Sequence, residues 1–161
     1  MEAARWTASC FNAQPWRFIL AARDEKKEFE AALACLNEWN RGWATSAPLL
    51  LFAVAQLDFD DGSPNRHALY DTGQAVAQLT VQATALGLFV HQMAGILPEQ
   101  IQQTYNLPEG HDAVSAAAIG YYGEPDGLEE GIRHKELAPR ERKPLSELVL
   151  AGGWEKPTTL S

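Results

Sequence analysis

Cysteine is scarce in this sequence, and positively charged side chains are few. The 161 residues include two cysteines, Cys10 and Cys35, which are too few for a disulfide framework and favour a reduced, cytoplasmic setting. Lys and Arg total 13 against 21 for Asp and Glu, so the formal net charge is −8. A chain this acidic is a poor general binder of nucleic acid or of an anionic membrane.

The sequence also lacks a secretory signal and a clear membrane span. Residues 1–11 contain no apolar core segment, which a signal peptide requires. The longest stretch without a charged residue, 72–98, is interrupted by polar side chains such as Gln78 and Gln82, so we expect a buried helix there and no membrane partner. The histidines and cysteines lack the spacing of metal ligands, so no metal site is predicted.

What the sequence does have is enough apolar residues, 46%, for one domain with a substantial core, residues 1–161. Helices and strands mix without strict alternation, which predicts an α+β fold. Strands are expected at 17–22, 48–55 and 113–121, a strand or turn at 89–93, a turn-rich loop at 58–65, and helices at 24–36, 71–86 and 98–106.

The helix expected at 71–86 is apolar on most sides. Asp71 is a plausible N-cap, and Gly87 ends the helix. Val76, Leu79, Ala83 and Leu86 form one apolar stripe, and further alanines lie on the other faces. Such a helix is buried on most sides, so we expect it to pass through the centre of the domain or to lie in a subunit interface.

The tail from residue 131 onward is polar and has too few apolar residues to pack alone, so we expect it to lie across another surface. Five of the 13 basic residues lie between Arg133 and Lys143. Arg140 and Arg142 are two residues apart and can point the same way on an extended segment. Their guanidinium groups suit phosphate oxygens; the alternative is a solvated tail.

The segment before the first expected strand, residues 8–15, places hydroxyl, thiol and amide side chains together. Such groups can hydrogen-bond a polar heterocycle from a loop, and Pro15 favours an extended conformation at Gln14. The alternative is an ordinary polar turn that leads into a strand.

Six segments, in order along the chain, resemble motifs of the nitroreductase family of FMN-dependent flavoproteins. They are AARWTASCFNAQPWRF (3–18), NRGWATSAP (40–48), YDTG (70–73), LGL with HQMAG (86–95), IGY (119–121) and RERKPL (140–145). The resemblance covers nearly the whole chain.

The resemblance implies a nitroreductase-like fold, with an antiparallel central sheet flanked by helices. It further implies a homodimer with FMN at the subunit interface and with the C-terminal arms, residues 131–161, exchanged between subunits. The family uses NAD(P)H to reduce nitro compounds, quinones or similar acceptors by a ping-pong hydride transfer through flavin N5. Because the cofactor carries that chemistry, no side chain is assigned as a catalytic acid, base or nucleophile.

The resemblance also implies cofactor-binding residues, position by position. Ser9, Asn12 and Gln14 match the loop that approaches the flavin, some of them from the partner subunit. Asn40 matches an amide that meets the pyrimidine edge of the ring.

The remaining assignments concern backbone groups and the phosphate. Ala94 and Gly95 match positions whose N–H groups face flavin N5 and O4, where small residues allow close approach. Gly120–Tyr121 matches the ribityl and phosphate side. Arg140 and Arg142 match the tail positions that hold the phosphate.

One family feature has no counterpart in the sequence. Family members begin with a helix and a basic loop of the form R-R-S-x-R, which contacts the FMN phosphate and ring, whereas the resemblance places Met1 where the second helix is expected to be under way. A short variant, a misassigned start and a fragment of a longer chain are all consistent with this position. Loss of such charge-assisted hydrogen bonds weakens FMN binding. A non-catalytic flavin-binding or structural dimer of the same fold is therefore the alternative function.

Overall fold

The structure, a computed structural model, describes residues 1–154 and 156. It divides into two compact units, residues 1–122 and a second unit that begins at Gly123. The elements of the first unit are α1 (Glu2–Arg5), η1 (Cys10–Asn12, a 3₁₀ turn), β1 (Trp16–Ala22), α2 (Lys26–Ala34), α3 (Glu38–Ala44), β2 (Leu49–Gln56), α4 (Ala68–Ala85), β3 (Phe89–Met93), α5 (Pro98–Tyr105) and β4 (His111–Gly120).

The four strands form one sheet in the order β1-β2-β4-β3. Every pairing is antiparallel, with Trp16 opposite Ala55, Leu49 opposite Ile119 and Phe89 opposite Gly120. The register between β2 and β4 shifts next to Ala53. The predicted α+β fold with an antiparallel central sheet is confirmed.

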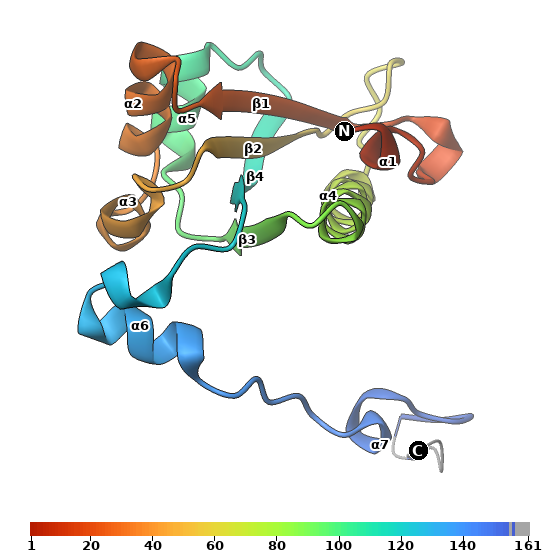
Figure 1. Ribbon diagram of the computed structural model, residues 1–161. Helices are drawn as coiled ribbons and strands as arrows, with labels where there is room; N and C mark the ends of the chain where they lie inside the picture. The colour runs from red at the N-terminus through yellow and green to blue at the C-terminus, as the bar shows by residue number, and fades with distance from the viewer. Residues whose placement is uncertain (155, 157–161) are drawn as a thin grey trace. The chain divides into compact units, whose positions relative to one another are not determined.

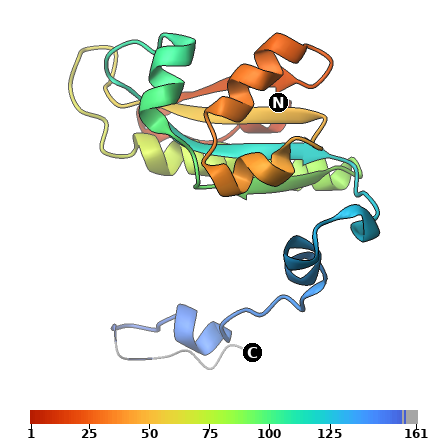
Figure 2. The ribbon, with the colours of Figure 1, turned by 90° about the vertical axis from the view of Figure 1, so that its left-hand side faces the viewer.

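Helices cover both faces of this sheet (Figures 1 and 2). Helices α2, α3 and α5 lie on one face, and α4 together with α1 lies on the other. Side chains alternate along β2, so Leu50 and Phe52 pack under the first layer and Leu51 and Ala53 under the second. A strand covered on both faces needs apolar residues at every position, which explains the nearly continuous apolar run that predicted it.

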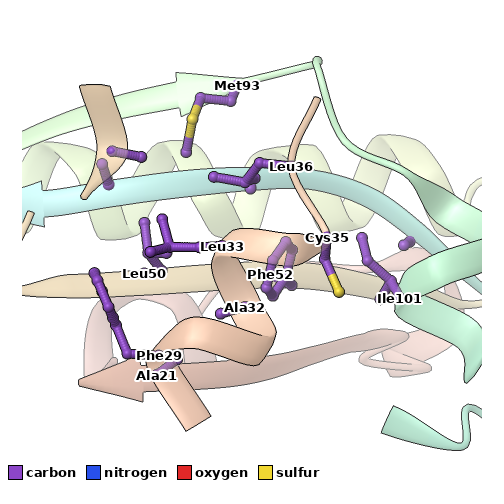
Figure 3. Packing of buried hydrophobic residues seen from close by; sticks show 14 residues of the cluster. Ala21, Phe29, Ala32, Leu33, Cys35, Leu36, Leu50, Phe52, Met93 and Ile101 are labelled. Carbon is purple, nitrogen blue, oxygen red and sulfur yellow. The ribbon is translucent and has the colours of Figure 1, made fainter. Parts of the chain in front are cut away.

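The larger hydrophobic cluster lies between the sheet and α2, α3 and α5 (Figure 3). Phe29 and Leu33 of α2 and Ile101 of α5 point toward the sheet, where Phe52 is fully buried. Cys35 is also fully buried there, and its thiol donates to Thr104 Oγ1 at 3.6 Å. Helices α2 and α5 thus have one apolar face each, as in ordinary amphipathic helices.

Helix α4 begins at Ala68, three residues before the predicted N-cap. Asn65 forms the turn before it, because its Oδ1 accepts from the His67 N–H at 3.1 Å. The prediction that Asp71 caps this helix is wrong: Asp71 lies inside the first turn, 3% exposed. Its carboxylate bonds to a distant part of the chain, which local sequence rules do not anticipate.

The same helix is buried on one side rather than on most sides. Val76 and Leu79 pack on the sheet, and Ala83 is buried as well, whereas Tyr70 and Val81 on another face are 67% and 68% exposed in the single chain. Leu86, which the sequence places in the stripe of Val76, lies just after the last residue of α4 and is 65% exposed, so its predicted burial is wrong. The apolar residues that suggested burial all round therefore form two faces, and one of them is open.

The second unit contains η2 (Pro125–Gly127, a 3₁₀ turn), α6 (Glu130–Leu137) and α7 (Leu145–Leu148). An ion pair of 3.0 Å joins Arg133 to Asp126. The expected arm, 131–161, falls within this unit, but its residues 155 and 157–161 lie outside the described residues. Within the described part of the chain, no helix combines the length and the apolar character needed to cross a bilayer.

Candidate functional site

The loop that precedes β1 has an unusual backbone. Phe11, Asn12 and Gln14 have φ angles of 50°, 59° and 48°, in the left-handed region that non-glycine residues rarely adopt. The Gln14 N–H donates to Ser9 Oγ (3.0 Å), and Gln14 Nε2 donates to the Asn12 carbonyl (3.0 Å). Strained residues cluster at ligand-binding sites, so this segment, loop 9–14, is the first part of the candidate site.

Two side chains outside loop 9–14 hold its ends. The carboxylate of Asp71 on α4 accepts from the Cys10 N–H at 2.9 Å. Arg17 on β1 donates from Nη1 to the Gln14 carbonyl (2.9 Å) and from Nη2 to Gln56 Oε1 on β2 (3.0 Å). The loop is therefore attached both to α4 and to the first two strands.

The second part of the candidate site is the turn after β3, which contains Ala94 and Gly95. The Gly95 carbonyl accepts from the Asn37 N–H (3.0 Å) and from Nδ2 of the buried Asn40 (3.1 Å). Asn37 caps α3, because its Oδ1 accepts from the Asn40 N–H at 2.9 Å. A side chain at position 95 would collide with both carboxamides, so the turn needs glycine there and is held against α3.

The third part is the end of β4. Gly120 lies against the start of β2, and a Cβ atom on it would stand 2.7 Å from Pro48 Cδ. Tyr121 follows directly and is 79% exposed. Glycine at 120 thus lets two chain segments approach closely, and the tyrosine after it presents a phenol ring to solvent.

Arg140 and Arg142 belong to the second unit, between α6 and α7, and both are exposed. Arg142 Nη1 donates to the Glu141 carbonyl at 2.8 Å. Neither arginine forms an ion pair with a residue that the structure describes, whereas the neighbouring Lys143 pairs with Glu147 at 3.6 Å. Both guanidinium groups retain donors for an anion.

Within one chain, the structure joins some of the predicted site residues but not all. Asn40 contacts Gly95, and Ser9, Asn12 and Gln14 share one loop. Loop 9–14 leads into β1, however, and Gly95 follows β3, and these are the two edge strands of the sheet (Figure 1). With about 4.8 Å between neighbouring strands, the two edges lie roughly 14 Å apart.

An open groove of about 630 Å³ runs beside loop 9–14. Phe11 and Phe59 meet edge to face in it, with 6.0 Å between ring centroids. Asp58, Asp60 and Asp61 also line it. Their negative charges repel an anion, so this groove is unsuited to binding a phosphate group.

Sequence reasoning missed three residues that shape the site: Arg17, Asn37 and Asp71. Asn37 had a usable signal, because asparagine directly before a helical segment is a common N-cap. The contacts of Arg17 and Asp71 join residues 39 and 61 positions apart. No local pattern encodes such pairs.

Comparison with known proteins gives consistent results. A family model described as the nitroreductase family matches residues 1–121. A 15.4 kDa uncharacterised protein from the ask 5′ region of Mycolicibacterium smegmatis is 31% identical over 147 residues, which cover 88% of this chain and 99% of the relative.

Two solved structures extend the similarity to the fold. A crystal structure described as an oxidoreductase containing FMN superposes with a TM-score of 0.90 at 30% identity, over 96% of this chain and 79% of that one. A nitroreductase family protein from Clostridium difficile 630 gives a TM-score of 0.71 at 25% identity, over 95% of this chain and 83% of its own.

Proposed function

The chain belongs to the nitroreductase family, and from that membership we propose that it is an FMN-dependent oxidoreductase. We propose that it uses NADH or NADPH to reduce nitro compounds, quinones or similar acceptors in the cytoplasm. The similarity to the FMN-containing oxidoreductase carries the proposal.

The donor set of the candidate site fits a flavin. Loop 9–14 and Asn40 supply hydroxyl and carboxamide groups that can bond the polar edge of a heterocycle. The turn at Ala94 and Gly95 has no bulky side chain, so a planar ring can approach its backbone. Arg140 and Arg142 offer the two-pronged donors that a phosphate takes best.

We propose that each of these groups positions the cofactor and that none acts as an acid, base or nucleophile. Ser9, Asn12, Gln14 and Asn40 orient the ring, and Gly120–Tyr121 borders the ribityl chain. FMN, when bound, supplies the hydride chemistry. The protein's contribution is then to fix the ring and to shape access to it, a role that the hydrogen-bonded Gly95 turn and loop 9–14 support.

We further propose that the protein works as a homodimer with exchanged C-terminal arms. Loop 9–14 and the Gly95 turn lie at opposite edges of one sheet, so a second copy is the simplest way to place both around one ring. The open apolar face of α4, with Tyr70 and Val81 exposed, is suited to such a contact because exposed apolar patches mark interfaces.

The test is a flavin titration followed by reduction. The purified chain is incubated with FMN, its visible spectrum is recorded, and NADH or NADPH is then added without oxygen. We expect tight binding at micromolar FMN, a dimeric mass by light scattering, and bleaching of the flavin bands by one of the two reductants.

The alternative, a non-catalytic dimer of the same fold, makes different predictions. It gives the same mass and circular dichroism but no bleaching, with weak or no retention of FMN. A dimer that binds FMN and is not reduced by either nucleotide would contradict the proposed NAD(P)H activity and leave a flavin-binding role. A chain that retains no FMN would contradict the FMN-dependent function itself.

A further inference from the structure

Resting on the proposed function, we propose that Asp71 and Arg17 are positioning residues that hold loop 9–14 in the conformation that binds the flavin. Neither residue belongs to the set that the family resemblance assigns to the cofactor. Both act through the loop, because their hydrogen bonds end on its backbone.

Asp71 anchors the first end of the loop. It is 3% exposed, and a buried carboxylate is unfavourable unless hydrogen bonds satisfy it. Its Oδ2 accepts from the Cys10 N–H (2.9 Å), and its Oδ1 lies 3.5 Å from Gln74 Nε2. Among the residues that the structure describes it has no ion-pair partner, but it lies in the first turn of α4, where the helix dipole favours negative charge.

Arg17 anchors the other end. Its Nη1 atom donates to the carbonyls of Gln14 and Trp16, both at 2.9 Å, and Nη2 donates to Gln56 Oε1 at 3.0 Å. The planar guanidinium thus connects the end of loop 9–14 to β2. Lysine cannot reproduce this geometry, because all the donors of its ammonium group are on one nitrogen atom, whereas these contacts use two nitrogens of the guanidinium.

The two anchors enclose the strained part of the loop. Phe11, Asn12 and Gln14, the residues with positive φ, lie between Cys10 and the Gln14 carbonyl. An unanchored loop populates more relaxed conformations. FMN then binds only the minor fraction of molecules whose loop has the binding conformation. The apparent dissociation constant rises in inverse proportion to that fraction.

The test compares Asp71→Ala and Asp71→Asn with the wild type. FMN affinity is measured by flavin fluorescence, and amide hydrogen exchange at Cys10 is measured without FMN. We expect Asp71→Ala to raise the FMN dissociation constant by about ten- to a hundredfold, because one charge-assisted hydrogen bond is lost, and to speed exchange at Cys10. Asp71→Asn keeps an acceptor oxygen, so we expect it to retain part of the FMN affinity and part of the protection of the Cys10 amide from exchange.

Thr72→Val is the matched control. Thr72 is the next residue of α4, is fully buried, and its Oγ1 has no hydrogen-bond partner among the described residues. Valine keeps its shape, so we expect unchanged FMN affinity and Cys10 exchange. An equal loss in Thr72→Val and Asp71→Ala would overturn the inference and indicate general damage to α4.

Arg17 provides an independent variant, because it is exposed and its replacement leaves the core intact. We expect Arg17→Lys to weaken FMN binding by about tenfold although the charge is kept. Wild-type affinity in both Arg17→Lys and Asp71→Ala overturns the inference. A wild-type protein that binds no FMN would contradict the proposed function and not this inference. In that case, amide exchange at Cys10 in Asp71→Ala still tests whether Asp71 anchors the loop.

Discussion

Position 95 requires glycine because neighbouring side chains occupy the space of a Cβ atom, and not because its backbone has a positive φ. A methyl group there would stand 2.5 Å from Asn40 Nδ2 and closer still to Asn37 Nδ2. We expect Gly95→Ala to lower the free energy of unfolding by about 1–3 kcal/mol, as overpacking does, and to weaken FMN binding. Urea denaturation and a flavin titration measure the two effects.

The control for Gly95→Ala is Gly42→Ala in the middle of α3. No described atom lies within 4 Å of a Cβ atom at position 42, so alanine should raise stability by about 0.5–1 kcal/mol through its better helix propensity. A Gly95→Ala protein as stable as Gly42→Ala would show that the two asparagines move aside freely.

Tyr105 is a second residue whose environment makes a measurable prediction. Burial, with a smaller contribution from Cys35, raises the pKa of Tyr105 to about 12. Its hydroxyl is buried without a hydrogen-bond partner among the described residues. We expect Tyr105→Phe to stabilise the protein at pH 7 by about 1 kcal/mol, because the unsatisfied group is removed. Urea unfolding at pH 7 measures this change.

The same substitution predicts a pH dependence. The pKa of Tyr105 is higher in the folded state than the unfolded value near 10, so the unfolded chain loses this proton first and wild-type stability falls between about pH 10 and 12. The advantage of Tyr105→Phe should therefore grow across that range. Tyr121→Phe, at a position that is 79% exposed, is the control; a constant difference between Tyr105→Phe and wild type would contradict the assignment.

At the scale of elements, α4 has two apolar faces with different roles. One packs on the sheet through Val76 and Leu79, and the other presents Tyr70, Ala77 and Val81 at helical spacing to the outside of the single chain. Small and apolar residues on an open face allow the close approach of a second helix. This face is the one that we propose as the interface of the homodimer.

Val81→Glu tests that assignment. A carboxylate placed in an apolar contact loses its hydration, so we expect the dimer dissociation constant to rise by tenfold or more, measured by light scattering over a concentration series. Ala34→Glu, on the exposed side of α2, is the matched control and should leave the dimer intact. An unchanged dimer in Val81→Glu would exclude this face as the interface.

At the scale of the whole molecule, the charge is unevenly distributed. The chain is acidic by eight charges, yet five of its 13 basic residues lie between positions 133 and 143. If Arg140 and Arg142 bind the FMN phosphate, replacing both with alanine should weaken FMN by roughly ten- to a hundredfold per contact. Riboflavin, which has no phosphate, should lose far less.

Fluorescence titration with both flavins measures this difference. Binding of FMN to the wild type should also weaken as salt rises, because exposed ionic contacts are screened. Lys26→Ala with Lys27→Ala removes the same charge from α2 and controls for net charge. Equal losses of affinity for FMN and riboflavin would indicate that the tail acts through dimer packing. Unchanged affinity for both flavins would mean that the two arginines are solvated and do not contact the phosphate.

Local patterns in the sequence predicted the α+β class, the strands other than β3 and the helices α2, α4 and α5, but missed α3, α6 and α7. Apolar runs and helical periodicity predicted strands at 17–22, 48–55 and 113–121, which the structure has as β1, β2 and β4 within two residues at each end. These signals are local, because a strand covered on both faces or a helix on a sheet must repeat its apolar residues at a fixed period. The ordered motifs also predicted the family.

The pairing of distant polar groups follows from the three-dimensional packing and could not be predicted from the sequence. The structure shows that Asp71 binds the Cys10 amide instead of capping its own helix, that Asn37 and Asn40 hold Gly95, and that one face of α4 stays open. These contacts join positions far apart in the sequence, and their partners are chosen by strand order and helix packing. The sequence shows a carboxylate or an amide but does not show its partner. The fold therefore decides whether such a group caps a helix, anchors a loop or binds a ligand.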